Sequence, residues 1–265
     1  MALAGAAVFG CEPQKKKLGL QLYTLRDVIN NDVGGTMKKL VEWGYNEFET
    51  YGYSDGNLFG MPAKEFYAYV KSLGARVTSG HYGIDVLRGD WEKAVADAKD
   101  GGQEYMVLPY IDEPNRTVEG YNQIIADVNK AAEVTNAAGI RMGYHNHHFE
   151  FEKVGDKTGF EMLIEGLDPK LVSWELDLYW VVRAGQDPEQ LINKYPGRFE
   201  QWHVKDMDKT SADRNADVGT GSIDFKKLFT LADKSGLKHW YVEQESYPVD
   251  PMTSTRNSAE YLKTI

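Results

Sequence analysis

The sequence predicts an α/β fold that consists of a single closed (β/α)8 TIM barrel. Short apolar runs alternate with longer helical patterns from Lys17 onward, and each apolar run stops at a polar residue. The 265 residues are enough for eight such units of about 30 residues each. A doubly wound open sheet is the alternative fold, but no glycine-rich phosphate turn follows the first apolar run. No linker divides the chain, so we expect one barrel over residues 17–265.

Eight runs rich in β-branched and aromatic residues are the predicted strands. The clearest two, LVSWELD and FEQWH, flank a helical pattern and end at Asp177 and His203. The other runs end in the same way near positions 23, 50, 81, 110, 145 and 243. In chain order, the predicted strands are 17–25, 45–50, 75–83, 104–111, 140–147, 171–177, 199–203 and 238–245.

Helix start and stop signals define the segments between these strands. Asp187 and Pro188 supply an N-cap and a first-turn proline, and Thr158 with Glu161 fits a capping box. Several of the helical patterns stop at a glycine, the residue preferred just past a helix end. The predicted helices are 36–44, 62–74, 91–102, 118–139, a short one that opens at 158, one from 187 to before 197, 225–236 and one near 258–264.

The charge of the chain argues against a nucleic-acid partner. The 30 Lys and Arg residues are outnumbered by 40 Asp and Glu residues, and the net charge is −10. The sequence has no basic stripe that would neutralise phosphates, and its one basic cluster, 15–17, is interpreted as a solvated linker. No apolar run reaches the roughly 20 residues that a transmembrane helix needs.

Residues 1–16 are predicted to lie outside the barrel. The small apolar run LAGAAVFG precedes Cys11 and a polar segment, which is the pattern of a bacterial lipoprotein signal. A disordered segment without function is the alternative. A lipoprotein signal predicts a periplasmic or lipid-anchored protein, whereas a disordered segment predicts a cytoplasmic one. A single cysteine also excludes an internal disulfide.

Polar residues at the predicted strand ends should share one face of the barrel. Carboxylates mixed with imidazoles at such a face suit a divalent ion, namely Mn²⁺, Mg²⁺, Co²⁺ or Zn²⁺. Each residue also has a structural alternative: Asp177 as a helix cap, His203 as a core histidine and Glu243 as a surface acid. The strand-end set is Tyr23, Glu49, His81, Tyr110, His145 to Glu150, Asp177, His203, Lys205, Glu243 and Glu245.

Five motifs in this order resemble the xylose isomerase-like TIM barrel superfamily, the sugar phosphate isomerase/epimerase family. They are GYHNHHFEF (143–151), ELDLYW (175–180), QWHVKDMD (201–208), VGTGSIDF (218–225) and YVEQES (241–246). The resemblance extends from about Lys17 to the C-terminus. It implies one divalent ion held by residues of strands five to eight, here Asp177, His203 and Glu243, with Glu150 as the favoured fourth ligand and His145 as the fallback.

The resemblance also implies a reaction, in which a proton is abstracted next to a carbonyl and an enediolate forms. Glu150 and Glu243 are then the general bases, and Lys205 hydrogen-bonds the oxyanion. If Glu150 binds the ion, His145 and His147 face the substrate. His81 and His147 are expected to hold hydroxyls, and a sugar ring is expected to lie against Tyr23, Trp180 or Trp202, of which at least one is instead packed in the core.

Several outcomes of this chemistry stay open. The first is a metal-dependent sugar isomerase or epimerase; the second is a 3-keto-glycoside lyase or hydrolase that cleaves by elimination; the third is a barrel that only binds sugar. The expected partner is a small sugar or keto-glycoside without phosphate, since no basic cluster accompanies the loop VGTGSID. Because isomerases of this fold often pair, a homodimer is also expected. The same superfamily includes multi-zinc DNA-repair endonucleases, which need more histidine ligands and a basic face. The net charge of −10 and the single-ion ligand set argue against this class.

Overall fold

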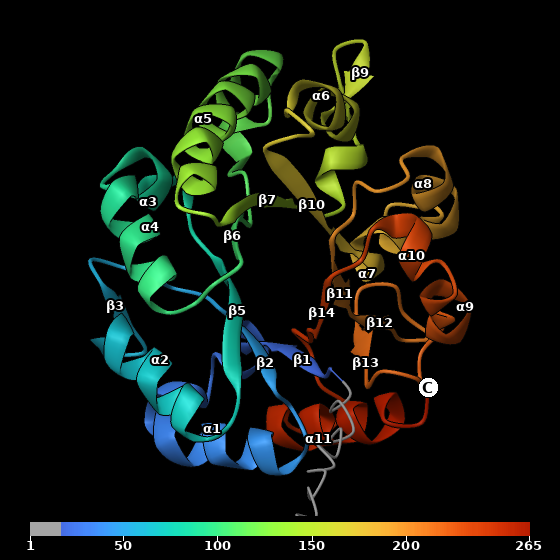
Figure 1. Ribbon diagram of the computed structural model, residues 1–265. Coiled ribbons are helices and arrows are strands. Elements are labelled where there is room, and N and C mark those ends of the chain that lie inside the picture. Colours follow the sequence, from blue (N-terminus) through green and yellow to red (C-terminus); the bar gives the residue numbers. More distant parts are fainter. Residues whose placement is uncertain (1–16) are drawn as a thin grey trace, which may run out of the picture.

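The computed structural model describes residues 17–265, which form a closed barrel of eight parallel strands surrounded by helices (Figure 1). Around the barrel the strand order is β1, β14, β11, β10, β7, β6, β5, β2. This order confirms the predicted (β/α)8 fold. The predicted lipoprotein-type segment, 1–16, lies outside the described residues. The barrel strands are β1 (Gly19–Gln21), β2 (Glu47–Thr50), β5 (Arg76–His81), β6 (Tyr105–Leu108), β7 (Arg141–His145), β10 (Val172–Asp177), β11 (Gln201–Val204) and β14 (His239–Val242).

The helices pack outside the barrel and follow the predicted pattern with three kinds of difference. Short helices α3 and α7 directly follow β5 and β10, and the predicted helix 225–236 is divided into α9 and α10 near Thr230. The last helix also begins earlier than expected, at Pro251, with Asp250 as its N-cap. The helices are α1 (Val33–Glu42), α2 (Ala63–Ser72), α3 (Ile84–Arg88), α4 (Trp91–Asp100), α5 (Val118–Ala137), α6 (Gly159–Gly166), α7 (Leu178–Arg183), α8 (Pro188–Lys194), α9 (Phe225–Phe229), α10 (Ala232–Ser235) and α11 (Pro251–Leu262).

Short elements that the sequence did not predict are concentrated after the barrel strands. Three two-stranded hairpins follow β2, β7 and β11, so they lie on the face where the strands end. The first predicted strand also stops early, at Gln21, whose side chain accepts a hydrogen bond from the backbone of Tyr23 and starts a 3-10 turn. These elements are the hairpins β3 (Asn57–Leu58) with β4 (Met61–Pro62), β8 (Lys153–Val154) with β9 (Lys157–Thr158) and β12 (Asp206–Met207) with β13 (Asn215–Ala216), and the 3-10 turns η1 (Leu22–Leu25), η2 (Ile29–Asn31), η3 (Glu113–Asn115) and η4 (Phe149–Phe151).

The two faces of the barrel strands differ in chemistry. Successive side chains of a strand point to opposite faces, so neighbours in sequence separate into an inner and an outer layer. Trp174 and Trp202 are fully buried among apolar side chains of the strand and helix layer. By contrast, Glu49, Glu175 and His203 are equally buried but make polar contacts with one another. A TIM barrel is usually filled by branched apolar residues, so a polar interior indicates a site.

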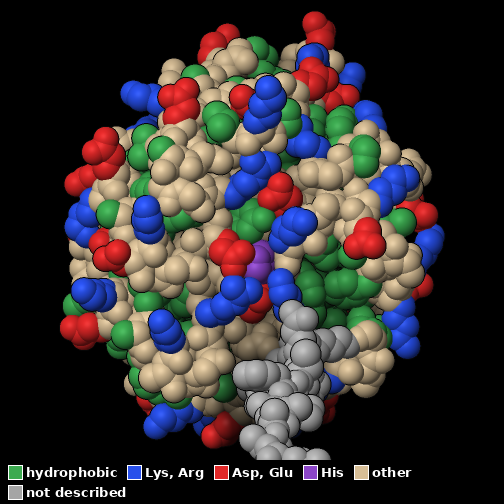
Figure 2. Space-filling view, viewed as in Figure 1, with side chains coloured by type: hydrophobic (Ala, Val, Ile, Leu, Met, Phe, Trp, Pro, Cys, Tyr) green, Lys and Arg blue, Asp and Glu red, His purple; other side chains and the backbone are tan. Residues whose placement is uncertain are grey.

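Two properties of the described residues bear on possible partners, namely the length of the apolar helices and the distribution of surface charge. Among residues 17–265, no helix is long and apolar enough to cross a membrane. On the face drawn in Figure 2, Lys and Arg side chains are interspersed with Asp and Glu side chains. The expectation that nucleic acid is not a partner stays a prediction, as does the homodimer.

Candidate metal centre and active-site pocket

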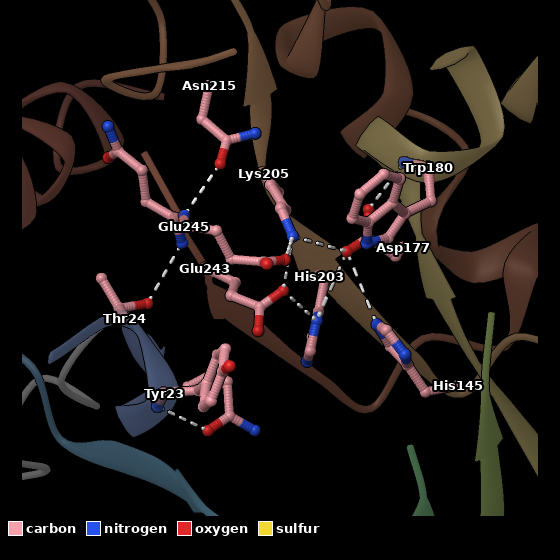
Figure 3. A network of polar contacts seen from close by, with 12 residues as sticks. Tyr23, Thr24, His145, Asp177, Trp180, His203, Lys205, Asn215, Glu243 and Glu245 are labelled. Carbon is pink, nitrogen blue, oxygen red and sulfur yellow. Dashed lines mark hydrogen bonds and ion pairs between the residues drawn. The ribbon is translucent and has the colours of Figure 1, made fainter. Parts of the chain in front are cut away.

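Four neighbouring strands bring together four donor side chains. They are His145 from β7, Asp177 from β10, His203 from β11 and Glu243 just after β14, and one ligand atom of each lies within 4.8 Å of the others. His145 Nε2 is 3.5 Å from Asp177 Oδ2, and His203 Nδ1 is 3.1 Å from Glu243 Oε2. Figure 3 shows these groups pointing toward one another. We call His145, Asp177, His203 and Glu243 the outer group.

Two atoms of the outer group have no hydrogen-bond partner among the described residues although they are buried: His145 Nε2 and Asp177 Oδ2. Burying such atoms unpaired is costly, and a cation between them removes the cost. Asp177 also caps α7, because its Oδ1 accepts a hydrogen bond from Trp180 N at 2.9 Å. One carboxylate therefore fills the structural role with one oxygen and presents the other to the centre.

A second group of the same composition lies beside the first, and we call Glu49, His81, Glu175 and His203 the inner group. His203 belongs to both groups because its two ring nitrogens face opposite ways: Nε2 is 2.7 Å from Glu49 Oε2. His81 Nε2 is 2.8 Å from Glu175 Oε2, and its ring stacks on that of His203. In this group the ring nitrogens that face the carboxylates are paired.

Lys205 is a fully buried ammonium beside the outer group. Its Nζ lies 3.0 Å from Glu243 Oε2 and 3.8 Å from Asp177 Oδ2, and it also contacts Glu245. Burial alone would lower the pKa of Lys205, but the carboxylates of Glu243 and Asp177 hold that pKa above its usual value. The ammonium also lies 4.7 Å from the centre of the Trp180 ring. The side chain is therefore a charged hydrogen-bond donor that is buried beside the outer group and does not itself line the cavity described below.

The charges in the barrel interior leave room for a cation. Glu49, Glu175, Asp177 and Glu243 are all buried there, and Lys205 is the one buried ammonium near them in the described part of the chain. Four carboxylates within this small space repel one another, and burial strengthens the repulsion. Burial lowers the pKa values of His81 and His203, but the facing carboxylates outweigh this and raise them above the usual value, so protonated imidazoles balance part of the charge. A divalent ion bound to the outer group would take over this role. Two imidazoles and two carboxylates in the outer group form a donor set that suits Zn²⁺, Co²⁺ or Mn²⁺ better than Mg²⁺.

Glu150, the favoured strand-five ligand of the sequence analysis, is not placed in either group. The chain turns through η4 directly after β7, and this turn carries the Glu150 side chain behind the strand, where Tyr144 Oη and His147 N donate to its carboxylate at 2.7 and 2.8 Å. Burial raises the pKa of Glu150 to about 7. The side chain at the strand end, His145, takes the place in the outer group that was expected for Glu150.

A cavity of about 830 Å³ opens above the outer group. Its lining includes Tyr23, His81, His147 and Trp180, the residues expected to face a substrate, together with His145 and Glu243. Burial lowers the pKa of His147 well below its usual value, so this imidazole is neutral. The volume of the cavity falls in the range of small-molecule binding sites.

Trp202 does not line this cavity, so the expectation that it contacts a sugar ring is wrong. It adjoins His203, so the strand alternation turns it toward the helices, where its Nε1 donates to Ser235 Oγ at 2.9 Å and its ring packs on Phe229. Core packing was the alternative expected for at least one of the aromatic residues.

The backbone amides of the loop VGTGSID are not free to bind a phosphate. The backbone N–H groups of Gly219, Gly221 and Ile223 all donate to the carboxylate of Asp206, at 2.9, 2.9 and 3.1 Å. The chain's own carboxylate thus occupies the anion position of the loop. This arrangement agrees with the expectation of a substrate without phosphate.

Sequence reasoning missed Glu175 and gave Glu49 no role. Glu175 lies in the middle of a predicted strand, two residues before Asp177, so both side chains point into the barrel. That spacing was the available signal. Glu49 accepts hydrogen bonds from Gln21 and Ser79. Neither of these two residues belongs to a sequence motif, and it is the closure of the barrel that brings them to Glu49.

Residues 37–265 match the family model for the xylose isomerase-like TIM barrel, and the chain belongs to this family. The match confirms the resemblance that the motifs indicated. Among curated proteins, an inosose dehydratase of Geobacillus thermodenitrificans (strain NG80-2) is 28% identical over 183 residues, which cover 61% of this chain and 60% of that protein. An inosose dehydratase of Lacticaseibacillus casei is 25% identical over 202 residues, with 67% and 66% covered.

Solved structures support the same family. A sugar phosphate isomerase/epimerase from Parabacteroides distasonis ATCC 8503 has a TM-score of 0.83 at 26% identity, and the match covers 98% of both chains. The curated relatives are matched over less of their length: the chain spans about three fifths of the inosose dehydratase from G. thermodenitrificans. The relatives named here are enzymes by name, namely inosose dehydratases and a sugar phosphate isomerase/epimerase.

Proposed function

We propose that the chain is a divalent-metal-dependent enzyme that abstracts a proton next to the carbonyl of a sugar-like substrate. The observation that carries this proposal is the outer group, in which four donors converge beside the cavity that His145 and Glu243 line. Two buried atoms of this group, His145 Nε2 and Asp177 Oδ2, have no hydrogen-bond partner among the described residues. A divalent ion bound there supplies Lewis-acid stabilisation of the negative oxygen that develops as the proton leaves.

The ligands that we propose are His145, Asp177, His203 and Glu243. His145 replaces Glu150 in this set because Glu150 is hydrogen-bonded behind β7. The resulting N2O2 set favours Zn²⁺, Co²⁺ or Mn²⁺. Glu243 also borders the cavity, so its carboxylate is the base that we propose for the substrate C–H bond.

Among the outcomes of proton abstraction, elimination has the stronger support. A carboxylate base and an ammonium acid lie side by side, since Lys205 Nζ is 3.0 Å from Glu243 Oε2. Glu243 takes the proton from the carbon next to the carbonyl, the C–H electron pair forms the new double bond, and the oxygen on the next carbon leaves with a proton from Lys205. The names of the inosose dehydratases described above denote an elimination of water, which is a reaction of this kind.

Isomerisation or epimerisation is the second candidate, and the fully covered P. distasonis relative is the observation that favours it. An epimerase needs a base on each face of the substrate. The second carboxylate expected for that role, Glu150, is buried away from the cavity, so His147, a neutral imidazole on the cavity wall, would have to replace it. An aldose–ketose isomerase needs a single base and is compatible with Glu243 alone.

Product analysis in heavy water with added Mn²⁺ tests the proposal. The substrates are an inosose, free ketoses and aldoses, and 3-keto-glycosides. Loss of water from the inosose, or release of the aglycone from a 3-keto-glycoside, is the result expected for elimination. If a sugar is instead recovered as its isomer or epimer with deuterium incorporated, the result would contradict elimination and support isomerisation or epimerisation. No reaction with any of them, in protein that binds the metal, would contradict both.

A further inference from the structure

His203 has two nitrogens and two different tasks. Its Nδ1 faces the outer group, 3.1 Å from Glu243 Oε2 and 3.6 Å from Asp177 Oδ2, whereas its Nε2 faces Glu49 Oε2 at 2.7 Å. A neutral imidazole carries one proton, so only one nitrogen offers a lone pair to an ion. Both nitrogens lie within hydrogen-bond distance of a carboxylate, and the contact of Nε2 with Glu49, at 2.7 Å, is shorter than that of Nδ1 with Glu243, at 3.1 Å. The proton is therefore expected on Nε2, and a bound ion would take the place of the proton at Nδ1.

Glu49 is held firmly as a hydrogen-bond acceptor. Its side chain is fully buried, Ser79 Oγ donates to Oε1 at 2.6 Å, and Gln21 Nε2 donates to Oε2 at 2.7 Å. Ser79 is held in turn by Gln201 Nε2, which donates to its hydroxyl at 2.9 Å. These contacts link β1, β2, β5 and β11, so the carboxylate is fixed by four strands of the barrel.

The inner group is a weaker candidate for an ion of its own. The ring nitrogens of His81 and His203 that face it already lie within hydrogen-bond distance of Glu175 and Glu49. Glu49 uses both oxygens: it accepts three hydrogen bonds, and His81 Nε2 also lies 3.2 Å from its Oε2, which satisfies a carboxylate that is buried as an acceptor. A second shell of this kind orients metal-binding histidines in many proteins.

We propose that Glu49 is a positioning residue of the metal centre: it accepts the Nε2 proton of His203 and thereby leaves Nδ1 unprotonated and aimed at the ion. The inference rests on the metal centre in the proposed function. It adds a residue that touches neither the ion nor the cavity, and it assigns the ring nitrogen that ligates.

The test combines ring tautomers with metal affinity. Protein labelled with ¹⁵N-histidine and loaded with Zn²⁺ is compared by long-range ¹H–¹⁵N spectra with the metal-free form, and the His203 signals are assigned from His203→Gln. We expect a protonated Nε2 and a metal-bound Nδ1. Zinc affinity is then measured by competition with a chromophoric chelator for wild type, Glu49→Gln and Glu175→Gln.

Glu49→Gln keeps the shape of the side chain but replaces the charged acceptor, and we expect an affinity loss of about 10- to 100-fold, as for other second-shell partners. Glu175→Gln is the matched control, because it removes one equally buried negative charge whose Oε2 lies 3.4 Å from His203 Nε2 and closer to His81. The control should lose clearly less affinity.

The outcomes separate this inference from the proposed function. Zinc bound through Nε2, an unchanged affinity in Glu49→Gln, or an equal loss in both variants would overturn the role of Glu49 and leave the metal centre in place. A wild-type protein that binds no zinc would overturn the metal centre, and the positioning role with it.

Discussion

The two groups inside the barrel have the same composition, two imidazoles and two carboxylates, yet they differ in how their atoms are satisfied. In the outer group, His145 Nε2 and Asp177 Oδ2 have no hydrogen-bond partner among the described residues. In the inner group, Glu49 receives three hydrogen bonds and the facing histidine nitrogens are paired, and among the described residues Glu175 Oε1 is the one buried atom of this group without a hydrogen-bond partner. The difference is that the two unpaired atoms of the outer group face each other at 3.5 Å, as ligands of one ion would, and residue types alone do not reveal this.

The largest effect is expected from Asp177→Asn, which breaks the outer group. The amide oxygen can still cap Trp180 N, so α7 should remain folded, but the negative charge is lost. We expect metal affinity to fall by more than the roughly 100-fold that a second-shell change reaches, and turnover to fall with it. Metal content after dialysis, measured by elemental analysis, checks this. Full occupancy in the variant would show that the outer group is not the site.

His145→Ala and Glu150→Gln sharpen the same point at the strand-five position. His145→Ala should lower metal occupancy, because its Nε2 belongs to the outer group. Glu150→Gln should not, because its carboxylate is hydrogen-bonded to Tyr144 and the backbone of His147. The reverse pattern would restore the ligand that the sequence favoured.

Lys205→Met tests whether the outer group performs chemistry beyond metal binding. The variant retains most of the side-chain volume and removes the proposed proton donor. We expect kcat to fall by about 10²- to 10⁴-fold, the usual contribution of a general acid, while the metal stays bound. Steady-state kinetics with parallel metal analysis measures both quantities. An unchanged kcat in metal-loaded protein would remove Lys205 from the mechanism.

The smallest effect concerns the pH dependence of stability, through Glu150. Its pKa is about 7 in the folded protein against an ordinary 4.5, so between these pH values the folded state holds a proton that the unfolded state has released. Stability from this group is therefore present at low pH and lost as the pH rises through 7, by about 3 kcal/mol.

Denaturant unfolding of wild type and Glu150→Gln from pH 4.5 to 8 measures this contribution. The difference in unfolding free energy between the two proteins should shift in favour of the variant by about 3 kcal/mol over that range. Parallel pH profiles would show that Glu150 is not protonated in the folded protein at neutral pH.

Most of the fold was predictable because strand ends and helix caps are local signals. The alternation of apolar runs gave all eight barrel strands in order, and the capping box at Thr158 begins α6 as expected. The hairpins after β2, β7 and β11 escaped prediction because two-residue strands have no measurable period. The early end of β1 escaped it because Gln21 starts a turn inside an apolar run.

The site was predictable wherever strand alternation alone decides the direction of a side chain. Asp177, His203 and Glu243 lie together, and the same alternation that turns His203 inward turns Trp202 outward. Glu150 was beyond reach, because a 3-10 turn after β7 sets its direction and the turn is fixed by contacts with Tyr144. The pairing of Glu49 with His203 was also beyond reach, because 154 residues separate them in the chain.

The carboxylate of Asp206 has a consequence for the energetics of substrate binding. It gathers the amides of Gly219, Gly221 and Ile223 and so orders the loop after β12 and β13 as the chain folds. A loop that waits for a ligand anion must lose its conformational entropy at the moment of binding, which weakens affinity. Here that entropy is already lost in the free protein, so the loop after β13 is ordered before any ligand arrives.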